Sequence, residues 1–202
     1  MMTDKKRIAV FASGSGSNFQ ALAEAVKTNT LPADIALLVC DNPQAFAVQR
    51  AEKLEIPVFS FYPKEYPSKQ AFETEVVNRL KEANVDFIVL AGYMRLIGPT
   101  LLAAFPNKIV NIHPSLLPAF PGKNAVGQAI EAGVKITGVT IHFVDEGMDT
   151  GPIIEQDSVR VTPVDTIDTL QAKIQRVEHE LYPKVIARIL TETSKKEEEA
   201  VK

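Results

Sequence analysis

Residues 8–26 read IAVFASGSGSNFQALAEAV, and this stretch decides the fold. The apolar run at 8–12 predicts a buried strand, and the apolar residues from Phe19 to Val26 recur at the spacing of a helix. Glycine and serine at 14–18 predict a tight turn between the two elements. A strand, a glycine turn and a helix are typical of the first unit of an α/β protein.

The same alternation continues along the chain. Further buried strands are predicted at 35–40, 58–61, 87–91 and 108–112, with helices at 45–53 and around 72–80. Because apolar strands alternate with helices, we expect an α/β fold with a mostly parallel, Rossmann-like twisted sheet and helices on both faces. Residues 138–144 and 153–161 are strand-like without an obvious helix between them, so they predict a late antiparallel addition.

The length and the last part of the chain indicate a single domain. The chain has 202 residues, of which 46% are hydrophobic and 23% charged, values typical of a globular protein with a core. A long helix is predicted from about residue 166 to 190. Residues 191–202 are charged and lack an apolar face, so we expect a domain at 1–190 and a disordered tail at 191–202.

Charge and cysteine content exclude several classes of protein. The net charge is −3, which disfavours a generally basic nucleic-acid binder. Cys40 is the only cysteine, so the chain has no intrachain disulfide and no cysteine-only metal site. The chain starts with polar residues rather than a signal peptide, and no apolar run reaches the roughly 20 residues of a membrane span. We therefore expect a cytoplasmic protein with neither a membrane nor a nucleic-acid partner.

The turn at 14–18 is the first candidate for chemistry. Free amide groups and the helix dipole at the start of a helix favour an anion such as phosphate. An ordinary strand-to-helix turn that binds nothing is the alternative. A dinucleotide site, for which Asp41 would be the ribose-binding acid, is disfavoured because Phe19 occupies the third glycine position of the Gly-x-Gly-x-x-Gly pattern. The loop therefore favours a mononucleotide or a sugar phosphate.

Asn111 and His113 are the second candidate. Alternate side chains of a strand share a face, so both should point the same way at the carboxyl end of a central strand. An amide can stabilise a developing oxyanion and an imidazole can carry a proton, so the pair suits acyl transfer. Structural hydrogen bonds at a strand end are the alternative.

The loop at 145–152 carries three acidic residues. They do not fall at the alternate positions of a calcium loop, and histidines 113, 142 and 179 lack the spacing of zinc ligands. A carboxylate from this loop beside His113 would favour the charged imidazolium. A solvated acidic loop is the alternative.

Four segments in order carry a family resemblance. They are GSGSN at 14–18, AGYMR at 91–95, NIHPSLLP at 111–118 and MDTGP at 148–152. Together they strongly resemble the phosphoribosylglycinamide formyltransferases, over about residues 6–190. Methionyl-tRNA formyltransferase shares the Asn-x-His-Pro-Ser segment but is longer, and formyltetrahydrofolate deformylase carries an additional amino-terminal domain.

The resemblance implies an activity and its residues. A formyl group would pass from 10-formyltetrahydrofolate to the amine of N1-(5-phospho-D-ribosyl)glycinamide in purine biosynthesis, without a metal. The implied catalytic residues are Asn111, His113 and Asp149. The implied ribonucleotide-binding residues are Gly14, Ser15, Gly16, Ser17, Asn18 and Glu178. The implied partners are these small molecules, with a homodimer possible.

The resemblance also implies a folate site. Its residues would be Lys69, Met94, Arg95, Leu96, Ile97, Asn111, Phe143, Val144 and Asp145. Two departures from the family stand out. Ser15 stands where asparagine is common, a minor change in a loop dominated by its backbone, and residues 123–127 replace a histidine-bearing stretch, so no role is carried over to them. Lys69 falls where some members carry an arginine, which keeps the charge but loses bidentate geometry.

Glu178 can also be assessed from helical spacing. It lies on the flank of an apolar stripe of the last helix, while His179 points away from that stripe. An acid turned toward the body of the protein could bind an amine, and a solvated helix edge is the alternative. For the whole chain, three other functions stay open: a deformylase, a dinucleotide-dependent oxidoreductase and a binding module without activity.

Overall fold

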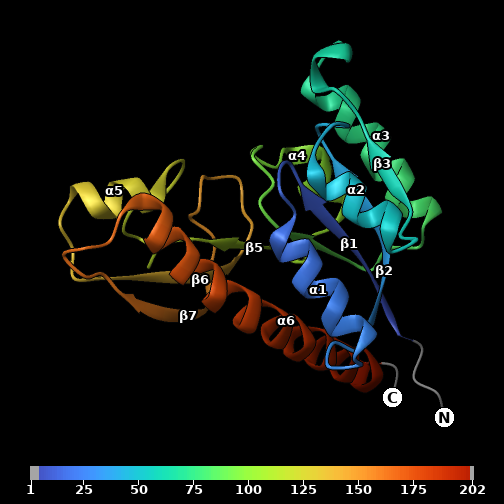
Figure 1. Ribbon diagram of the computed structural model, residues 1–202. Helices are drawn as coiled ribbons and strands as arrows, with labels where there is room; N and C mark the ends of the chain where they lie inside the picture. Colours follow the sequence, from blue (N-terminus) through green and yellow to red (C-terminus); the bar gives the residue numbers. More distant parts are fainter. Residues whose placement is uncertain (1–4, 201–202) are drawn as a thin grey trace.

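The computed structural model describes residues 5–200, which form one seven-stranded sheet with helices on both of its faces (Figure 1). The strands are β1 Lys6–Ala12, β2 Ala33–Cys40, β3 Val58–Ser60, β4 Phe87–Leu90, β5 Ile109–His113, β6 Ile136–Phe143 and β7 Ile153–Arg160. The helices are α1 Ser17–Lys27, α2 Phe46–Lys53, α3 Lys69–Glu82, α4 Pro99–Ala104, α5 Ala125–Glu131 and α6 Ile167–Ala200, with a 3-10 turn, η1, at Pro63–Glu65.

The sheet is parallel over most of its width. Its strand order is β3-β2-β1-β4-β5-β6-β7, and the pairs from β3 to β5 are all parallel. Strand β6 runs antiparallel to β5, and β7 runs antiparallel to β6. The predicted mostly parallel α/β sheet with a late antiparallel addition is confirmed.

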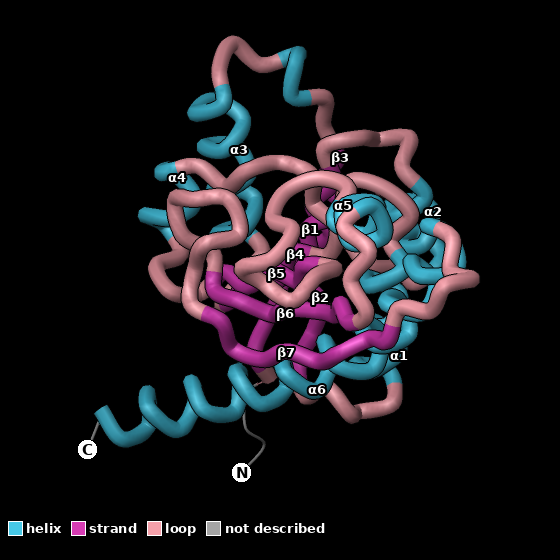
Figure 2. The backbone as a smooth tube through the Cα atoms, turned by 90° about the vertical axis from the view of Figure 1, so that its left-hand side faces the viewer, coloured by secondary structure: helices cyan, strands magenta, loops and turns pink. Residues whose placement is uncertain are grey.

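Helices lie on both sides of the sheet (Figure 2), and an apolar layer packs on each of its faces. Alternate residues of β1 divide between them: Val10 belongs to the layer under α1 and α6, and Phe11 to the layer under α3 and α4. Both residues are fully buried. Burial on both faces explains why β1 is an unbroken apolar run rather than an alternating pattern.

The strand order reverses direction beside β1. The chain moves outward from β1 to β2 and β3, then returns to the other side of β1 at β4 and continues to β5. Loops that leave the carboxyl ends of β1 and β4 therefore diverge and leave a crevice between them. Ligands of open α/β sheets bind at such a switch point.

Three helices differ from the expectations. Helices α4 and α5 were not predicted, because each is at most two turns long and too short to show a clear apolar stripe. The last helix continues to Ala200, beyond its predicted end near residue 190. The division into a domain at 1–190 and a disordered tail at 191–202 stays a prediction. Lysine, glutamate and alanine are good helix formers, which explains the extension. Residues 1–4 and 201–202 lie outside the described residues.

Within residues 5–200, no helix is both long enough and apolar enough to span a membrane. Cys40 is buried at the end of β2, as expected for a thiol that acts as a small apolar side chain.

Candidate active site

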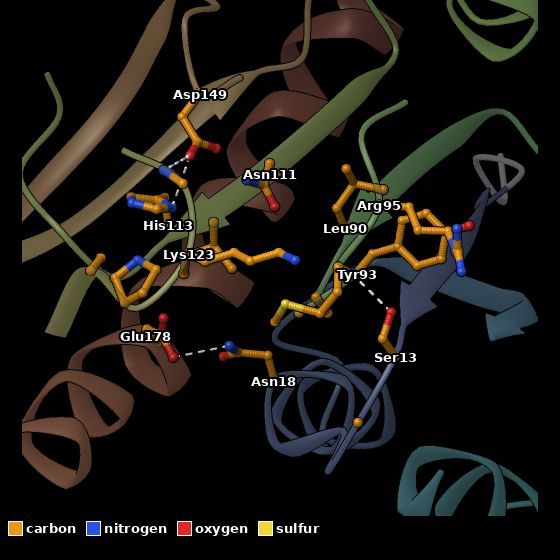
Figure 3. Close-up of a pocket in the computed structure, with 18 of the residues that line it drawn as sticks. Ser13, Asn18, Leu90, Tyr93, Arg95, Asn111, His113, Lys123, Asp149 and Glu178 are labelled. Atoms are coloured by element: carbon orange, nitrogen blue, oxygen red, sulfur yellow. Dashed lines mark hydrogen bonds and ion pairs between the residues drawn. The ribbon is translucent and has the colours of Figure 1, made fainter. Parts of the chain in front are cut away.

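A cavity of about 610 Å³ opens at the carboxyl ends of β1, β4 and β5. The loops after these strands, the loop after β6 and the first half of α6 contribute its walls. The predicted turn at 14–18, the pair Asn111 and His113, and Asp149 all line it (Figure 3). Segments that are far apart in sequence thus meet at one site.

Asn111 and His113 point to the same side of β5, as the alternation of the strand predicts. His113 is buried, and its Nε2 donates to the carbonyl oxygen of Phe120 at 2.9 Å. Asn111 lies opposite His142 of β6, and its Nδ2 is 3.2 Å from His142 Nε2. His142 Nδ1 donates to the carbonyl of Phe143 at 2.8 Å, so its Nε2 is the ring nitrogen that faces the Asn111 amide.

Asp149 joins the two histidines. Its Oδ2 is 3.3 Å from His113 Nδ1, and its Oδ1 is 3.6 Å from His142 Nε2. The backbone N–H of Gly122 also donates to Oδ2, at 2.8 Å. Burial by itself raises the pKa of Asp149, but the His142 ring, the Gly122 N–H and the two imidazole charges outweigh it and lower the pKa below its ordinary value. Asp149 is therefore a carboxylate at neutral pH.

The two partners of His113 are both hydrogen-bond acceptors. A carbonyl oxygen and a carboxylate oxygen both only accept hydrogen bonds, and they face the two ring nitrogens. A neutral ring carries one N–H and could satisfy only one of them. Both ring nitrogens of His113 thus face oxygen atoms that accept hydrogen bonds, one of them the carboxylate that was expected beside this histidine.

The turn at 14–18 has the geometry of an anion site. Helix α1 begins at Ser17, and its first-turn N–H groups receive no side-chain cap. Within residues 5–200, the N–H groups of Ser15 and Gly16 also have no hydrogen-bond acceptor. Free amides and the helix dipole provide partial positive charge for an anion at this edge of the cavity.

Gly16 is required by both conformation and space. Its φ is +69°, in the left-handed region, and a Cβ at this position would lie 2.7 Å from the Cβ and 2.8 Å from the Cα of Ala47. We expect Gly16→Ala to lower the free energy of unfolding by about 2–5 kcal/mol in denaturant titrations. Gly14→Ala is the control, because a Cβ at Gly14 would meet nothing within 4 Å. Equal stability of the two variants would contradict the explanation.

Glu178 enters the site from α6. It is buried and accepts a hydrogen bond from Asn18 Nδ2 at 3.0 Å (Figure 3). Tyr182, one turn later, donates to the carbonyls of Leu90 at 2.8 Å and Val110 at 3.2 Å, and so fixes α6 against the sheet. Burial raises the pKa of Glu178, and the Asn18 hydrogen bond only partly offsets this effect.

The segment after β4 forms an apolar wall. Met94 is 68% exposed and Leu96 is 47% exposed, although both line the cavity. The Met94 N–H donates to Ser13 Oγ at 2.9 Å, which ties this segment to the end of β1. Exposed apolar side chains at a cavity mouth suit a flat, largely apolar ligand.

Arg95 follows Met94 and is already paired. Its Nε donates to Asp41 Oδ2 at 2.7 Å, and its guanidinium lies 5.9 Å from the centre of the Phe72 ring. Asp41, the candidate ribose-binding acid of a dinucleotide site, is thus engaged by a protein side chain. The contact holds the Arg95 guanidinium beside Asp41.

Comparison with known proteins decides between the remaining functions. The model of the family described as formyl transferase matches residues 6–186. The chain belongs to the formyl transferase family.

Relatives of the chain narrow this assignment. The phosphoribosylglycinamide formyltransferase of Bacillus subtilis (strain 168) is 55% identical over 92% of this chain and 95% of its own. The crystal structure of the phosphoribosylglycinamide formyltransferase from Bacillus halodurans superimposes with a TM-score of 0.91 at 58% identity, over 93% of this chain and 97% of the other. The crystal structure of glycinamide ribonucleotide transformylase 1 from Geobacillus kaustophilus superimposes with a TM-score of 0.90 at 60% identity, over 93% of this chain and 100% of the other. The formyl transferase is thus an enzyme of purine biosynthesis, and a deformylase or oxidoreductase is not favoured.

The cavity of this formyl transferase brings most of the predicted site residues together. The lining includes Gly14, Ser15, Gly16, Ser17, Asn18, Met94, Arg95, Leu96, Ile97, Asn111, His113, Val144, Asp149 and Glu178. Their contacts with substrates stay predictions.

Three residues predicted for the folate site lie outside the lining. Lys69 is at the start of α3, where its Nζ is 3.9 Å from the buried Glu73. The Asp145 carboxylate accepts from the Gly147 N–H at 3.0 Å and from Thr150 Oγ1 at 2.8 Å, so it shapes its own loop. Phe143 packs against the core layer under α6. A direct role of these three in binding folate stays a prediction.

Other residues of the formyl transferase cavity were missed. The sequence analysis considered His142 only when it found no zinc-ligand spacing, and the place of His142 opposite Asn111 depends on the antiparallel register of β6. Lys123 comes from the stretch to which no role was assigned, yet it lines the cavity and its side chain extends into it (Figure 3). Gln171 and Gln175 precede Glu178 on α6 by about two turns and one turn, and helical spacing could have found them.

Metal ligation has little support in the geometry. Across residues 5–200, no group of three or more His, Cys, Asp and Glu side chains is arranged to hold a metal ion. His113 and His142 instead share the carboxylate of Asp149.

Proposed function

We propose that the chain transfers a formyl group from 10-formyltetrahydrofolate to the amine of glycinamide ribonucleotide. One observation carries the proposal: an anion-binding turn and the trio of Asn111, His113 and Asp149 share a single cavity with an apolar mouth. The turn suits the substrate phosphate, and the wall at 94–97 suits the pterin and benzoyl rings of a folate. Mass spectrometry of the amine substrate after incubation should show its conversion to the formamide.

In the proposed mechanism, the cavity holds the neutral amine beside the formyl carbon and removes much of the entropic barrier of a bimolecular step. The amine nitrogen bonds to the formyl carbon, whose carbonyl oxygen takes up the electron pair. Asn111 and the protonated His113 donate hydrogen bonds to this oxyanion, while Asp149 keeps His113 charged. The C–N bond to the folate then breaks, and the amine proton passes through water to the departing folate nitrogen.

The contacts of His113 define what must change during this reaction. Its Nε2 is bonded to the Phe120 carbonyl and its Nδ1 faces Asp149. Donation to an oxyanion therefore requires His113 either to release the Phe120 carbonyl or to share its Nδ1 proton. Phe120 has a φ of +56°, a backbone conformation that costs free energy in a non-glycine residue. A shift of this loop would free Nε2 for the oxyanion.

A hydrolytic deformylase would use the same trio, with water in place of the amine. The anion-binding turn and the buried Glu178 support the transferase instead, because a hydrolase has no need to hold a phosphate-bearing amine. We further propose that the enzyme is cytoplasmic and that its substrates are small molecules. A homodimer stays a prediction.

Glu178→Gln should separate binding from stability. The glutamine side chain can still accept from Asn18, but it cannot pair with an ammonium or amine as a carboxylate does, so we expect the KM for the ribonucleotide to rise about tenfold. Burial raises the folded-state pKa of Glu178, which makes the ionised carboxylate destabilising at neutral pH. The variant should therefore unfold at the same temperature as the unsubstituted chain at pH 7, or at a higher one. An unchanged KM together with a lower unfolding temperature would show that Glu178 is structural.

A further inference from the structure

The first three carbonyl groups of the anion-binding turn, those of Gly14, Ser15 and Gly16, are held by donors from the protein. The Gly14 carbonyl accepts from the Ala47 N–H at 3.0 Å, and the Gly16 carbonyl accepts from the Gln20 N–H at 2.9 Å. The Ser15 carbonyl between them accepts from Arg50 Nε at 2.9 Å. Arg50 is the one side chain among these three donors.

These bonds fix the directions of the amide groups. In a planar trans peptide, the N–H of one residue points opposite to the C=O of the residue before it. When Arg50 holds the Ser15 carbonyl, the Gly16 N–H is turned away from Arg50. Gly16 lines the cavity and Arg50 does not, so the side opposite Arg50 is the cavity side. The Ala47 N–H holds the Gly14 carbonyl, so by the same reasoning the Ser15 N–H points away from Ala47.

Arg50 is itself held on several sides. Its Nη1 donates to Gln20 Oε1 at 3.3 Å, and its guanidinium carbon lies 4.7 Å from the centre of the Phe46 ring. Gln20 is oriented in turn, because its Nε2 donates to Glu24 Oε1 at 3.0 Å. Arg50 therefore connects α2, α1 and the turn, and little rotamer freedom is left to its guanidinium.

We propose that Arg50 is a positioning residue that turns the Gly16 amide toward the substrate phosphate. The inference rests on the proposed function, which supplies the phosphate. Arg50 does not touch the phosphate in this account, because it lies behind the turn. It acts by keeping the peptide that joins Ser15 and Gly16 in one orientation, while its charge offsets that of the dianion through the turn.

Arg50→Ala should raise the KM for glycinamide ribonucleotide about tenfold, leave its kcat within about twofold, and leave the KM for the formyl donor unchanged. The decisive substrate is the matching ribonucleoside, which has the amine but lacks the phosphate. Its kcat/KM should be the same for the variant and for the unsubstituted chain. An equal loss with both substrates would overturn the proposal, because it would show a general disturbance of the site.

Arg79→Ala is the matched control. Arg79 is a half-exposed arginine on α3, away from the turn. Its Nη2 lies 2.9 Å from Glu75 Oε1, and its guanidinium carbon lies 5.4 Å from the centre of the Phe59 ring. Arg79→Ala should change neither kcat nor the KM for either substrate. Gln20→Ala should weaken ribonucleotide binding in the same direction as Arg50→Ala and by a smaller factor. No effect of Gln20→Ala on ribonucleotide binding would contradict the proposal, so this variant keeps the proposal testable if Arg50→Ala fails to fold.

Calorimetry with ribose 5-phosphate separates this inference from the proposed function. The unsubstituted chain should bind the sugar phosphate more tightly than Arg50→Ala by about tenfold, whether or not formyl transfer occurs. If the unsubstituted chain binds it but transfers no formyl group, the proposed function fails and the role of Arg50 stands. If both chains bind it equally, Arg50 does not position the turn.

Discussion

Replacing His113 by alanine is expected to lower kcat at least about 100-fold, because the variant loses the cationic donor to the oxyanion. His113 is buried at the end of β5, and its Nδ1 lies 3.3 Å from Asp149 Oδ2. It contributes no group to the turn that we propose for the phosphate. Binding of ribose 5-phosphate, measured by calorimetry, should therefore be unchanged.

The His113→Ala experiment needs a check of the fold. Truncating a buried imidazole leaves a space and frees the Phe120 carbonyl, so some loss of stability is expected as well. Circular dichroism and sugar-phosphate binding show whether the domain is intact. An intact variant with near-normal turnover would remove His113 from the mechanism.

Asp149→Asn is expected to lower kcat by a similar factor, about 100-fold. The amide oxygen of asparagine can still accept from the Gly122 N–H, so the loop should keep its shape. The negative charge is lost, and with it the stabilisation of the imidazolium form of His113. Steady-state kinetics with both substrates at saturation would measure the effect on kcat alone.

Glu146→Gln is a suitable control for Asp149→Asn, since Glu146 is an exposed acid on the same loop and does not line the cavity. The kcat of Glu146→Gln should stay within about twofold of that of the unsubstituted chain.

The stability of Asp149→Asn gives a second test. The folded-state pKa of Asp149 is lowered, so its contribution is present above the unfolded-state pKa of about 4 and is lost as the pH falls through the folded-state value. The stability difference between the Asn variant and the unsubstituted chain should thus shrink below about pH 4. A variant that changed only stability would show that Asp149 is structural.

The order of the elements was predictable because each strand of the parallel sheet is covered on both faces. Ile8, Val10 and Phe11 are all fully buried, which turns a strand into a short apolar run that stands out from the sequence. The short helices were not predictable by the same means. Helix α4 still carried a signal, since Gly98 is followed by Pro99 at the first helical position.

Two parts of the site followed from local geometry. The alternation of β5 was enough to place Asn111 and His113 on one side, and helical spacing was enough to turn Glu178 inward. Asp149 could be assigned only through the family resemblance, because its distance from His113 depends on how the loop after β6 returns over β5.

Other contributions arise only from tertiary structure. His142 reaches Asn111 through the antiparallel register of β6, which no local pattern encodes. Arg50 reaches the Ser15 carbonyl from the next helix along the chain, across 35 residues. His179, predicted to point away from the core, is instead half-buried. Burial, together with the like charge of Arg50, lowers its pKa despite the opposing effect of Glu24.

The most direct test of the account is the release of tetrahydrofolate from 10-formyltetrahydrofolate, followed by absorbance with and without glycinamide ribonucleotide. We expect release only when the amine substrate is present, at a rate that saturates with its concentration. Release at the same rate without the amine would contradict the account. It would mean that water takes the place of the amine, and that the turn at 14–18 does not position a phosphate-bearing nucleophile.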